Sequence, residues 1–331
     1  MGNIIFKVFV LSSLFFIAGC GGTASPTPAA TKSPASRRIS EFPLLTPRSA
    51  PFGIAAGLDH NLWFTEGNVY KIGRITPTGT ISEFLIPTHY GYPQEIAAGA
   101  DGNLWFTEIL GNKIGRITPD GTISEFPVPT SIASPYGITA GPGGTLWFTE
   151  ENGNKIGRIT SNGTISEFPV PTQKSSLAEI TEGPDGNLWF TENGANKIGR
   201  ITPGGRISEF SIPTRQSYPE GITAGPNDSV WFAEIAGNKI GRITPNGTIT
   251  EFPMPVPRSG PFGIAIGSDG NLWFTEANGD KIGRITPNGI ISEFPVSTPK
   301  SSPYGIAAGP DSNLWFTEFA SNKIGRIRPT G

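Results

Sequence analysis

The chain has 331 residues, of which 36% are hydrophobic and 16% charged, and its 25 Lys and Arg against 27 Asp and Glu give a net charge of −2. A protein that binds along nucleic-acid phosphates needs a surplus of basic side chains, so this balance argues against nucleic acid as a partner. One cysteine cannot form an internal disulfide or a cysteine-based zinc site, and two histidines severely limit histidine-based catalysis.

The first twenty residues have the features of a secretory signal. Lys7 precedes an apolar run over residues 8–19, which is shorter than the roughly 20 residues of a membrane-spanning helix. Residues 17–20, Ile-Ala-Gly-Cys, resemble the bacterial lipobox, in which the cysteine is lipidated and becomes the mature N-terminus. We therefore expect residues 1–20 to be a lipoprotein signal peptide with Cys20 as the lipidation site. The alternative is an ordinary signal that is cleaved before an unmodified cysteine.

Residues 21–38 are small, polar and rich in Pro, Ser and Ala, a composition that predicts a disordered tether. A multiply acylated cysteine would anchor such a tether stably, since a single acyl chain binds a membrane only marginally. We expect an exported protein that is attached through Cys20 to the extracytoplasmic side of a bacterial membrane.

From Ile39 onward the chain consists of repeats. Seven tryptophans lie 42 residues apart, each within the phrase Leu-Trp-Phe-Thr-Glu or its one variant, Val-Trp-Phe-Ala-Glu. Every repeat contains four short β-prone segments, GIAAG, LWFTE, KIGRIT and ISEFPVP, which are separated by turns rich in Gly, Asn and Asp. Four strands in about 40 residues are typical of a propeller blade. We expect residues 39–331 to form an all-β, seven-bladed propeller of four-stranded blades.

The order of the segments predicts how the ring closes. The phrase ISEF occurs at residues 39–42, before the first LWFTE, whereas the last repeat ends without an ISEF segment of its own. We expect this N-terminal strand to complete blade seven, which buries the edges that an open array would expose. A closed ring of this kind is expected to be a monomer.

A candidate ligand face follows from the places where the repeats differ. In a propeller, the loop entering the inner strand and the loop between strands two and three share one face. There the X of the Pro-X-Gly-Ile motif and the residue after it vary among the blades. The candidate residues are Phe52, Gln94, Glu95, Tyr136, Glu179, Glu220, Phe262 and Tyr304. They predict an aromatic and acidic bowl suited to an amphipathic or cationic ligand, or to a hard cation such as Mg²⁺ or Ca²⁺.

A glutamate ends the second segment of every repeat. The seven are Glu66, Glu108, Glu150, Glu192, Glu234, Glu276 and Glu318. They either belong to the same bowl or bond neighbouring backbone and lysine side chains. Lys71, Arg74 and their equivalents are expected to form ion pairs on the blade surface, many with the glutamates of ISEF.

The units LWFTE, GNKIGRIT and ISEFPVPT closely resemble those of the virginiamycin B lyase family, and the resemblance covers residues 39–331. It implies a propeller that opens a cyclic depsipeptide by elimination at its ester bond, with Mg²⁺ and a histidine general base. In the family, the base and a substrate-contacting histidine occupy the X of Pro-X-Gly-Ile in the last two blades, where this chain has Tyr304 and Phe262. One metal-binding glutamate of the family matches Ser302, and the candidate metal ligands here are Glu318 and Glu276.

Two functions remain from this comparison, because tyrosine, with a usual pKa near 10, is a poor base at neutral pH. The first is a lipid-anchored propeller that binds a small molecule or an extracellular protein and lacks the family's histidine-dependent lyase site. The alternative is an enzyme, either a Mg²⁺-dependent carbon–oxygen lyase with relocated groups such as Glu220 or His89, or another metal-assisted lactone-cleaving enzyme. The substrate of such a carbon–oxygen lyase would be streptogramin B. Convergence of three oxygen ligands at the channel mouth would distinguish the two.

Overall fold

The computed structural model describes residues 38–329. The expected signal peptide, its lipidation site Cys20 and residues 21–37 of the expected tether lie outside the described residues. In the described part of the chain, regular structure is almost entirely β, with two one-turn 3₁₀ segments, η2 (Gly67–Val69) and η3 (Pro142–Gly144). Within residues 38–329, no helix has the length and apolar character needed to cross a membrane.

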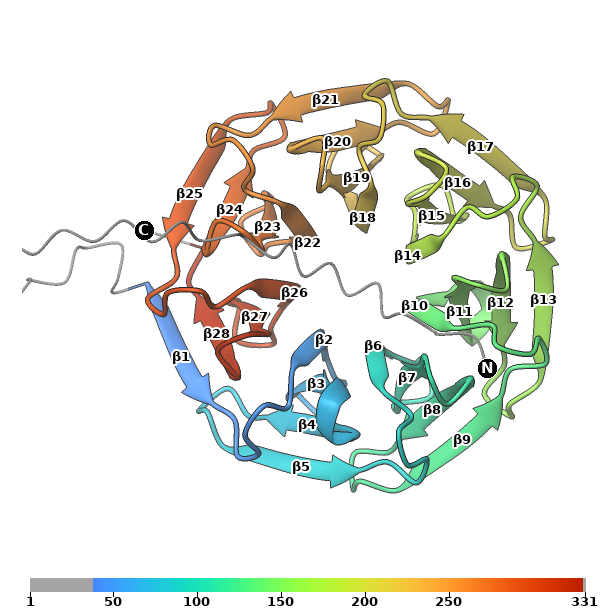
Figure 1. The fold of residues 1–331 in the computed structure, drawn as a ribbon, viewed down its shortest axis with the longest axis vertical. Coiled ribbons are helices and arrows are strands. Elements are labelled where there is room, and N and C mark those ends of the chain that lie inside the picture. Colours follow the sequence, from blue (N-terminus) through green and yellow to red (C-terminus); the bar gives the residue numbers. More distant parts are fainter. Residues whose placement is uncertain (1–37, 330–331) are drawn as a thin grey trace, which may run out of the picture. The chain divides into compact units, whose positions relative to one another are not determined.

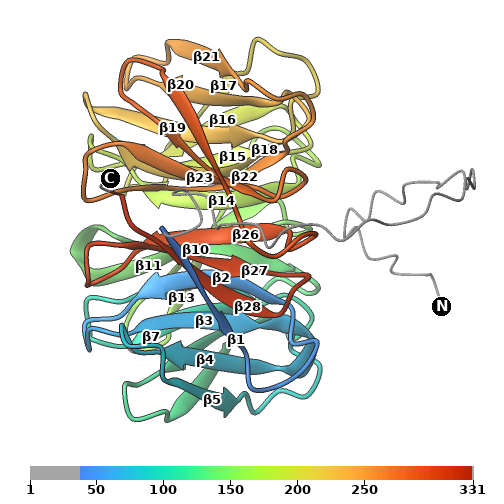
Figure 2. The same ribbon diagram turned by 90° about the vertical axis from the view of Figure 1, so that its left-hand side faces the viewer.

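Seven four-stranded antiparallel sheets are arranged in a ring around a central channel (Figures 1 and 2). Blade one contains β2 (Pro51–Ala56), β3 (Leu62–Glu66), β4 (Lys71–Ile75) and β5 (Ile81–Leu85), and blade two contains β6 (Pro93–Ala98), β7 (Leu104–Glu108), β8 (Lys113–Ile117) and β9 (Ile123–Pro127). Blade three contains β10 (Pro135–Gly141), β11 (Thr145–Glu150), β12 (Lys155–Ile159) and β13 (Ile165–Pro169), and blade four contains β14 (Leu177–Glu182), β15 (Leu188–Glu192), β16 (Lys197–Ile201) and β17 (Ile207–Ser211). Blade five contains β18 (Pro219–Gly225), β19 (Ser229–Glu234), β20 (Lys239–Ile243) and β21 (Ile249–Pro253), and blade six contains β22 (Pro261–Ile266), β23 (Leu272–Glu276), β24 (Lys281–Ile285) and β25 (Ile291–Pro295). Blade seven contains β26 (Pro303–Ala308), β27 (Leu314–Glu318), β28 (Lys323–Ile327) and β1 (Ile39–Pro43). The predicted fold class is confirmed.

The chain closes its ring as predicted, through its first described strand. β1 pairs antiparallel with β28, with Ile39 opposite Ile327 and Phe42 opposite Ile324. Phe42 stacks on Trp315 at 5.4 Å, as the equivalent Phe and Trp side chains do in the other blades. Because β1 supplies the outer strand of blade seven, the edge of β28 is paired rather than exposed.

The hydrophobic core lies between neighbouring blades, and the LWFTE phrase supplies most of it. Each side chain of β3 is buried, and Trp63 packs in one cluster with Leu104 and Phe106 of the next blade. The Arg74 guanidinium lies 5.4 Å from the Trp63 ring, on the outer side of the same stack. Burial of large aromatic side chains contributes strongly to stability, so the repeated phrase accounts for the stacking of the blades.

Seven lysine–glutamate ion pairs tie the outer strands to the loops between blades, as expected for the glutamates of ISEF. In blade one, Lys71 Nζ lies 2.7 Å from Glu83 Oε2, and this carboxylate also accepts hydrogen bonds from the amide and hydroxyl of Thr46. Burial by itself would raise the pKa of Glu83, but the hydrogen bonds from Lys71 and Thr46 outweigh it and lower the pKa. These outer glutamates are therefore ionised parts of the frame.

Candidate ligand-binding site

The inner strands of the blades present the variable Pro-X-Gly positions to the channel. In blade one the register between β2 and β3 shifts between Pro51 and Ile54, which leaves Phe52 and Gly53 in a bulge. Such bulges reorient side chains and are common beside functional sites.

The threonine of LWFTE fixes each bulge to the next blade. Thr65 Oγ1 accepts a hydrogen bond from the Gly53 amide at 2.9 Å and donates one to the carbonyl of Gln94 at 2.7 Å. Equivalent threonines donate to the carbonyl at the next X position in five other blades, whereas blade five has Ala233 at this place. The rigid frame therefore sets where each X side chain enters the channel.

Four aromatic side chains meet across the channel, as the sequence predicts. The ring of Phe52 stacks on Tyr304 at 5.2 Å and meets Phe262 edge-on at 5.6 Å. Phe262 and Tyr304 are 4.5 Å apart between ring centroids, and Phe52 lies 6.2 Å from Tyr136. Phe319, which follows the glutamate of β27, packs against the outer side of Tyr304 at 5.2 Å. These rings form the apolar wall of the site.

Glu220 lies on the acidic side of the channel and is firmly held. Its carboxylate accepts a hydrogen bond from the Tyr136 hydroxyl at 3.0 Å and another from Asn193 Nδ2 at 2.8 Å. Burial raises the pKa of Glu220 to about 7, although both hydrogen bonds act in the opposite direction. Glu220 is therefore partly protonated at neutral pH.

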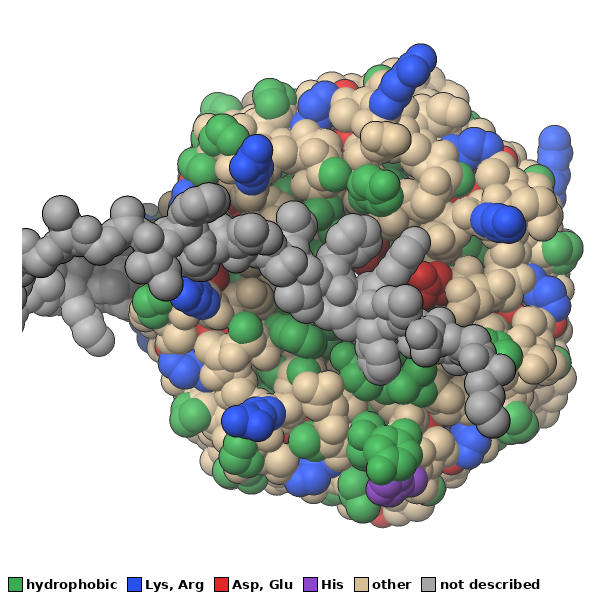
Figure 3. Space-filling model, in the orientation of Figure 1, with side chains coloured by type: hydrophobic (Ala, Val, Ile, Leu, Met, Phe, Trp, Pro, Cys, Tyr) green, Lys and Arg blue, Asp and Glu red, His purple; other side chains and the backbone are tan. Residues whose placement is uncertain are grey.

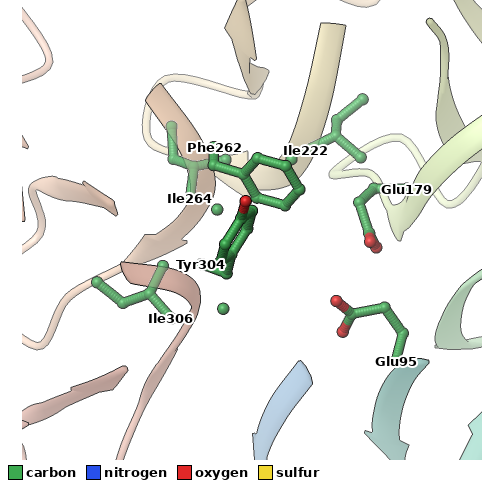
Figure 4. A pocket seen from close by; sticks show the side chains of 10 residues that line it. Glu95, Glu179, Ile222, Phe262, Ile264, Tyr304 and Ile306 are labelled. Atoms are coloured by element: carbon green, nitrogen blue, oxygen red, sulfur yellow. The ribbon is translucent and has the colours of Figure 1, made fainter. Parts of the chain in front are cut away.

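Glu95 and Glu179 project from blades two and four with their carboxyl groups facing each other (Figure 4). The two groups are hydrogen bonded, which requires a proton on one of them because a carboxylate only accepts. Burial, reinforced by the charge of Glu220, raises the pKa of Glu95 to about 8, and burial and the charge of Glu95 raise the pKa of Glu179 well above its usual value. At neutral pH at least one of the two carboxyl groups is therefore protonated.

A pocket of about 80 Å³ separates this acidic pair from the aromatic wall (Figure 4). Glu95 and Glu179 line one side, and Phe262 and Tyr304 line the other. Ile222, Ile264, Ile306 and the glycine backbones at 221, 263 and 305 complete the lining. Seven of the eight residues of the predicted face thus meet in one contact network in the channel. Four of them, Glu95, Glu179, Phe262 and Tyr304, line the pocket itself. The eighth residue, Gln94, is buried.

The glutamates that end the second strands do not belong to this bowl, although the sequence left that open as one of two alternatives. All seven have 0% of their surface exposed, and a glycine of the following turn lies close to the side chains of Glu108, Glu150, Glu234 and Glu276. Burial and the neighbouring charge of Glu83 raise the pKa of Glu66 to about 7, and Glu108 reaches about 8 for the corresponding reasons. Two of these glutamates bond neighbouring side chains instead, which was the other expectation. Glu192 accepts a hydrogen bond from the Ser175 hydroxyl at 2.8 Å, and Glu318 accepts one from the Ser321 hydroxyl at 2.6 Å.

The residues at the family's metal-binding positions do not fit a Mg²⁺ ion. The Glu318 carboxyl is fully buried beside Ser321, and Glu276 is buried in the neighbouring blade. Ser302 stands at the other ligand position, and its amide donates to Asp280 at 3.2 Å. Within residues 38–329 there is no group of three or more His, Cys, Asp or Glu side chains that could hold a metal ion. No chemical step through a metal follows from this site.

His89 lies at the rim rather than in the pocket. Its exposed ring is 4.0 Å from Tyr90 and 5.6 Å from Tyr70, in the loop that enters blade two. Figure 3 shows this face, with a histidine among hydrophobic side chains near its edge and acidic side chains near its centre. The structure therefore does not bring His89 together with Glu220.

Sequence reasoning missed two side chains that hold the site. Asn193 bonds Glu220 and Phe319 packs on Tyr304, and both directly follow the strand-two glutamate of their blade. The residues in this column are Gly67, Ile109, Glu151, Asn193, Ile235, Ala277 and Phe319. Its variability between otherwise similar repeats is the same kind of signal that singled out the Pro-X-Gly column.

The fold and this pocket define a seven-bladed propeller with an aromatic and acidic site in its central channel. A model described as the virginiamycin B lyase family matches residues 31–177, 98–272 and 138–331 of the chain. The chain belongs to the virginiamycin B lyase family, which confirms the resemblance seen in its repeats.

Solved structures of the family are similar over nearly the whole ring. Selenomethionine-substituted virginiamycin B lyase from Staphylococcus aureus is 45% identical with a TM-score of 0.85, and the match covers 88% of this chain and 99% of that one. A streptogramin B lyase structure is 42% identical with a TM-score of 0.85, over 89% and 99%. A catalytically inactive histidine-to-alanine variant of the Staphylococcus aureus enzyme with quinupristin is 44% identical with a TM-score of 0.85, over 88% and 99%.

Proposed function

We propose that this protein is an exported, lipid-anchored propeller that binds a small molecule or an extracellular protein at its channel mouth and does not catalyse the elimination of its lyase relatives. The observation that carries the proposal is the state of Tyr304, which stands where the family has its base. Its ring is enclosed by Phe52, Phe262 and Phe319. Burial, followed by the charges of Glu220 and Tyr92, raises the pKa of Tyr304 above 10. A phenol in this state stays protonated at neutral pH and cannot remove a proton from a substrate.

The missing metal ligands support the same conclusion. The family relies on Mg²⁺ next to its base, whereas this chain has Ser302 and the buried Glu318 at the matching positions. A magnesium ion needs oxygen ligands at about 2.0–2.1 Å in near-octahedral geometry. The rings that contact Tyr304 are those of Phe52, Phe262 and Phe319, and the two carboxyl groups of its pocket, on Glu95 and Glu179, come from blades two and four rather than from the family's ligand positions.

The second candidate function is a lyase or lactone-cleaving enzyme with a relocated base. The observation that favours it is the Glu95–Glu179 pair, because a carboxyl with a pKa of about 8 is suited to proton transfer near neutral pH. This pair lines the same pocket as Tyr304. In this reading one carboxylate of the pair would accept the substrate proton in place of the family histidine.

Quinupristin distinguishes the two functions, since it occurs with a staphylococcal relative in one of the solved structures. The protein is incubated with quinupristin and Mg²⁺ at pH 7.5, and the mixture is analysed by chromatography with fragment-ion mass spectrometry. Elimination leaves the mass unchanged, so retention and fragmentation must report the opened ring. We expect intact quinupristin, with or without EDTA. A linear product above the buffer control would show that the protein is an enzyme, and its loss in Glu179→Gln would identify the relocated base.

A further inference from the structure

We propose that the pocket between the Glu95–Glu179 pair and the Phe262–Tyr304 pair binds a compact organic ammonium group, such as the end of a primary amine or a quaternary ammonium head. The inference rests on the proposed binding function and names the ligand class for it. It follows from the charge, the aromatic wall, the size of the pocket and the way in which the two glutamates are accommodated.

The acidic side of the pocket lacks a cation. Each outer glutamate, such as Glu83, has a lysine partner, but among residues 38–329 no Lys or Arg forms an ion pair with Glu95, Glu179 or Glu220. Glu179 Oε1 is buried and has no hydrogen-bond partner among those residues. A buried polar oxygen without a donor is costly, so its position at a pocket points to a ligand that donates hydrogen bonds or carries positive charge.

The opposite side of the pocket suits an organic cation. Phe262 and Tyr304 lie across the pocket from the two carboxyl groups, and Ile222, Ile264 and Ile306 supply further hydrocarbon surface (Figure 4). Aromatic rings attract a cation within about 6 Å of the ring centroid, and more strongly when the site is shielded from water. A site with carboxylates on one side and rings on the other recognises both the charge and the carbon atoms of an ammonium group.

The size and lining of the pocket argue for an organic cation rather than a hard metal ion. A volume of about 80 Å³ is several times the 10–15 Å³ that one water needs by the same kind of measure, so a few non-hydrogen atoms fit. Calcium takes six to eight oxygen ligands. Among the described residues, only two charged groups line the pocket, Glu95 and Glu179. The Tyr304 hydroxyl and three glycine backbones are its other polar groups, and Phe262 and three isoleucines supply hydrocarbon.

The fold accommodates the two glutamates by placing glycine in the blade before each of them. A Cβ added at Gly53 would lie 2.6 Å from Glu95 Oε2, and one added at Gly137 would lie 3.0 Å from Glu179 Oε2. A side chain at either glycine would therefore displace the carboxyl group that follows it around the ring. The alternation of glycine and glutamate leaves both carboxyl groups room to reach the pocket.

Calorimetric titration of the full protein tests the proposal. Tetramethylammonium chloride and ethylammonium chloride are the probes at pH 8.5, above the pKa of Glu95, with sodium chloride at equal ionic strength as the blank. We expect saturable binding of at least one probe and about tenfold or greater weakening in Glu95→Gln and in Glu179→Gln. Glu182→Gln is the matched control, since Glu182 is exposed on the same strand as Glu179, and should bind like the unaltered protein.

Phe262→Leu provides a second variant that leaves both carboxyl groups in place. It should weaken tetramethylammonium binding severalfold, because it removes a ring and keeps an apolar side chain. Circular dichroism establishes that each variant is folded before its titration is interpreted.

Three results would overturn the proposal: no saturable binding of either probe, unchanged affinity in Glu179→Gln, or tight binding of Ca²⁺ in preference to both ammonium ions. Failure of the proposed function is recognised separately, because linearised quinupristin would refute the binding role whether or not the ammonium ions bind.

Discussion

The hydroxyl of Tyr136 donates a hydrogen bond to Glu220 at 3.0 Å, although 84 residues separate them in the chain. The two side chains come from blades three and five, so the contact crosses the channel instead of following a blade. Asn193, from blade four, holds the other oxygen of Glu220 at 2.8 Å. Three blades are thereby joined through one buried carboxyl group, which directly precedes the pocket-lining Gly221 in the chain.

Replacing Tyr136 should reveal the strength of this link. Tyr136→Phe removes a donor from a buried carboxyl, so we expect a loss of about 1–3 kcal/mol in the free energy of unfolding. Urea denaturation followed by tryptophan fluorescence measures it. Tyr304→Phe is the control in the same channel, and it should change stability by less than about 0.5 kcal/mol. Equal effects of the two substitutions would show that the bond to Glu220 contributes nothing.

The strand-two glutamates should make the ring more stable at pH 5 than at pH 8. Burial and the charge of Glu167 raise the pKa of Glu150 from 4.5 to about 7. A group with a raised pKa gives its full stabilisation below pH 4.5 and loses it as the pH rises through about 7. Glu167 has a lowered pKa, and its contribution is lost only as the pH falls below 4.5. The maximum of stability should therefore lie near pH 5.

Glu150→Gln tests the origin of this pH dependence. It removes a titrating group that is nearly neutral at pH 5, so stability there should change little. At pH 8 it should gain about 1–3 kcal/mol, since one pKa unit corresponds to about 1.4 kcal/mol. Thermal unfolding at both pH values is the measurement, with the exposed Glu182→Gln as the control. A Tm that rises from pH 5 to pH 8 would contradict the account.

Replacing the glycine of KIGRI with a larger residue should destabilise the ring. A Cβ added at Gly157 would lie 2.1 Å from the Phe148 ring, and each of the other blades has the same close approach. Gly157→Ala should cost about 1–3 kcal/mol or more through overpacking. Gly204→Ala is the control, because the nearest atom to its added Cβ is 3.9 Å away. Chemical denaturation of both variants decides, and a Gly157→Ala protein of unchanged stability would refute the packing argument.

Cys20→Ser should release the protein from the membrane. Lipidation requires the thiol, so the altered protein should incorporate no radiolabelled palmitate and should leave the membrane fraction. The unaltered protein should be labelled and should remain in the membrane fraction. Ser13→Ala, within the apolar run of the expected signal, is the control and should leave labelling unchanged. Equal labelling of the Cys20→Ser protein would eliminate the proposed anchor.

The fold could be read from the sequence because its determinants are local and repeated. The spacing of Trp63 and its equivalents predicts the number of blades. The ISEF segment at residues 39–42, which precedes the first complete repeat, predicts the closure by β1. Both signals can be seen along the chain without knowing which side chains meet in space, because the repeats recur at a fixed spacing and the last one lacks an ISEF segment.

The site was only partly predictable because its contacts lie between repeats. The pattern breaks identified Glu95, Glu179 and the aromatic residues, but spacing along the chain does not reveal which side chains meet across a channel. For the same reason, the sequence could not decide whether the glutamates that end the second strands face the bowl or are buried. Glu66 ends its strand on the side of the ring that carries the site, yet its side chain is completely buried.

A single-turnover experiment, with the protein in excess over quinupristin and with Mg²⁺ present, tests whether the channel has lost the lyase reaction. Excess protein reveals even very slow ring opening, and the staphylococcal lyase in a parallel sample shows that the assay detects the product. Quinupristin should remain intact after overnight incubation with this protein. A linear product that EDTA abolishes would contradict this expectation and show that the channel is an active site with a base other than Tyr304.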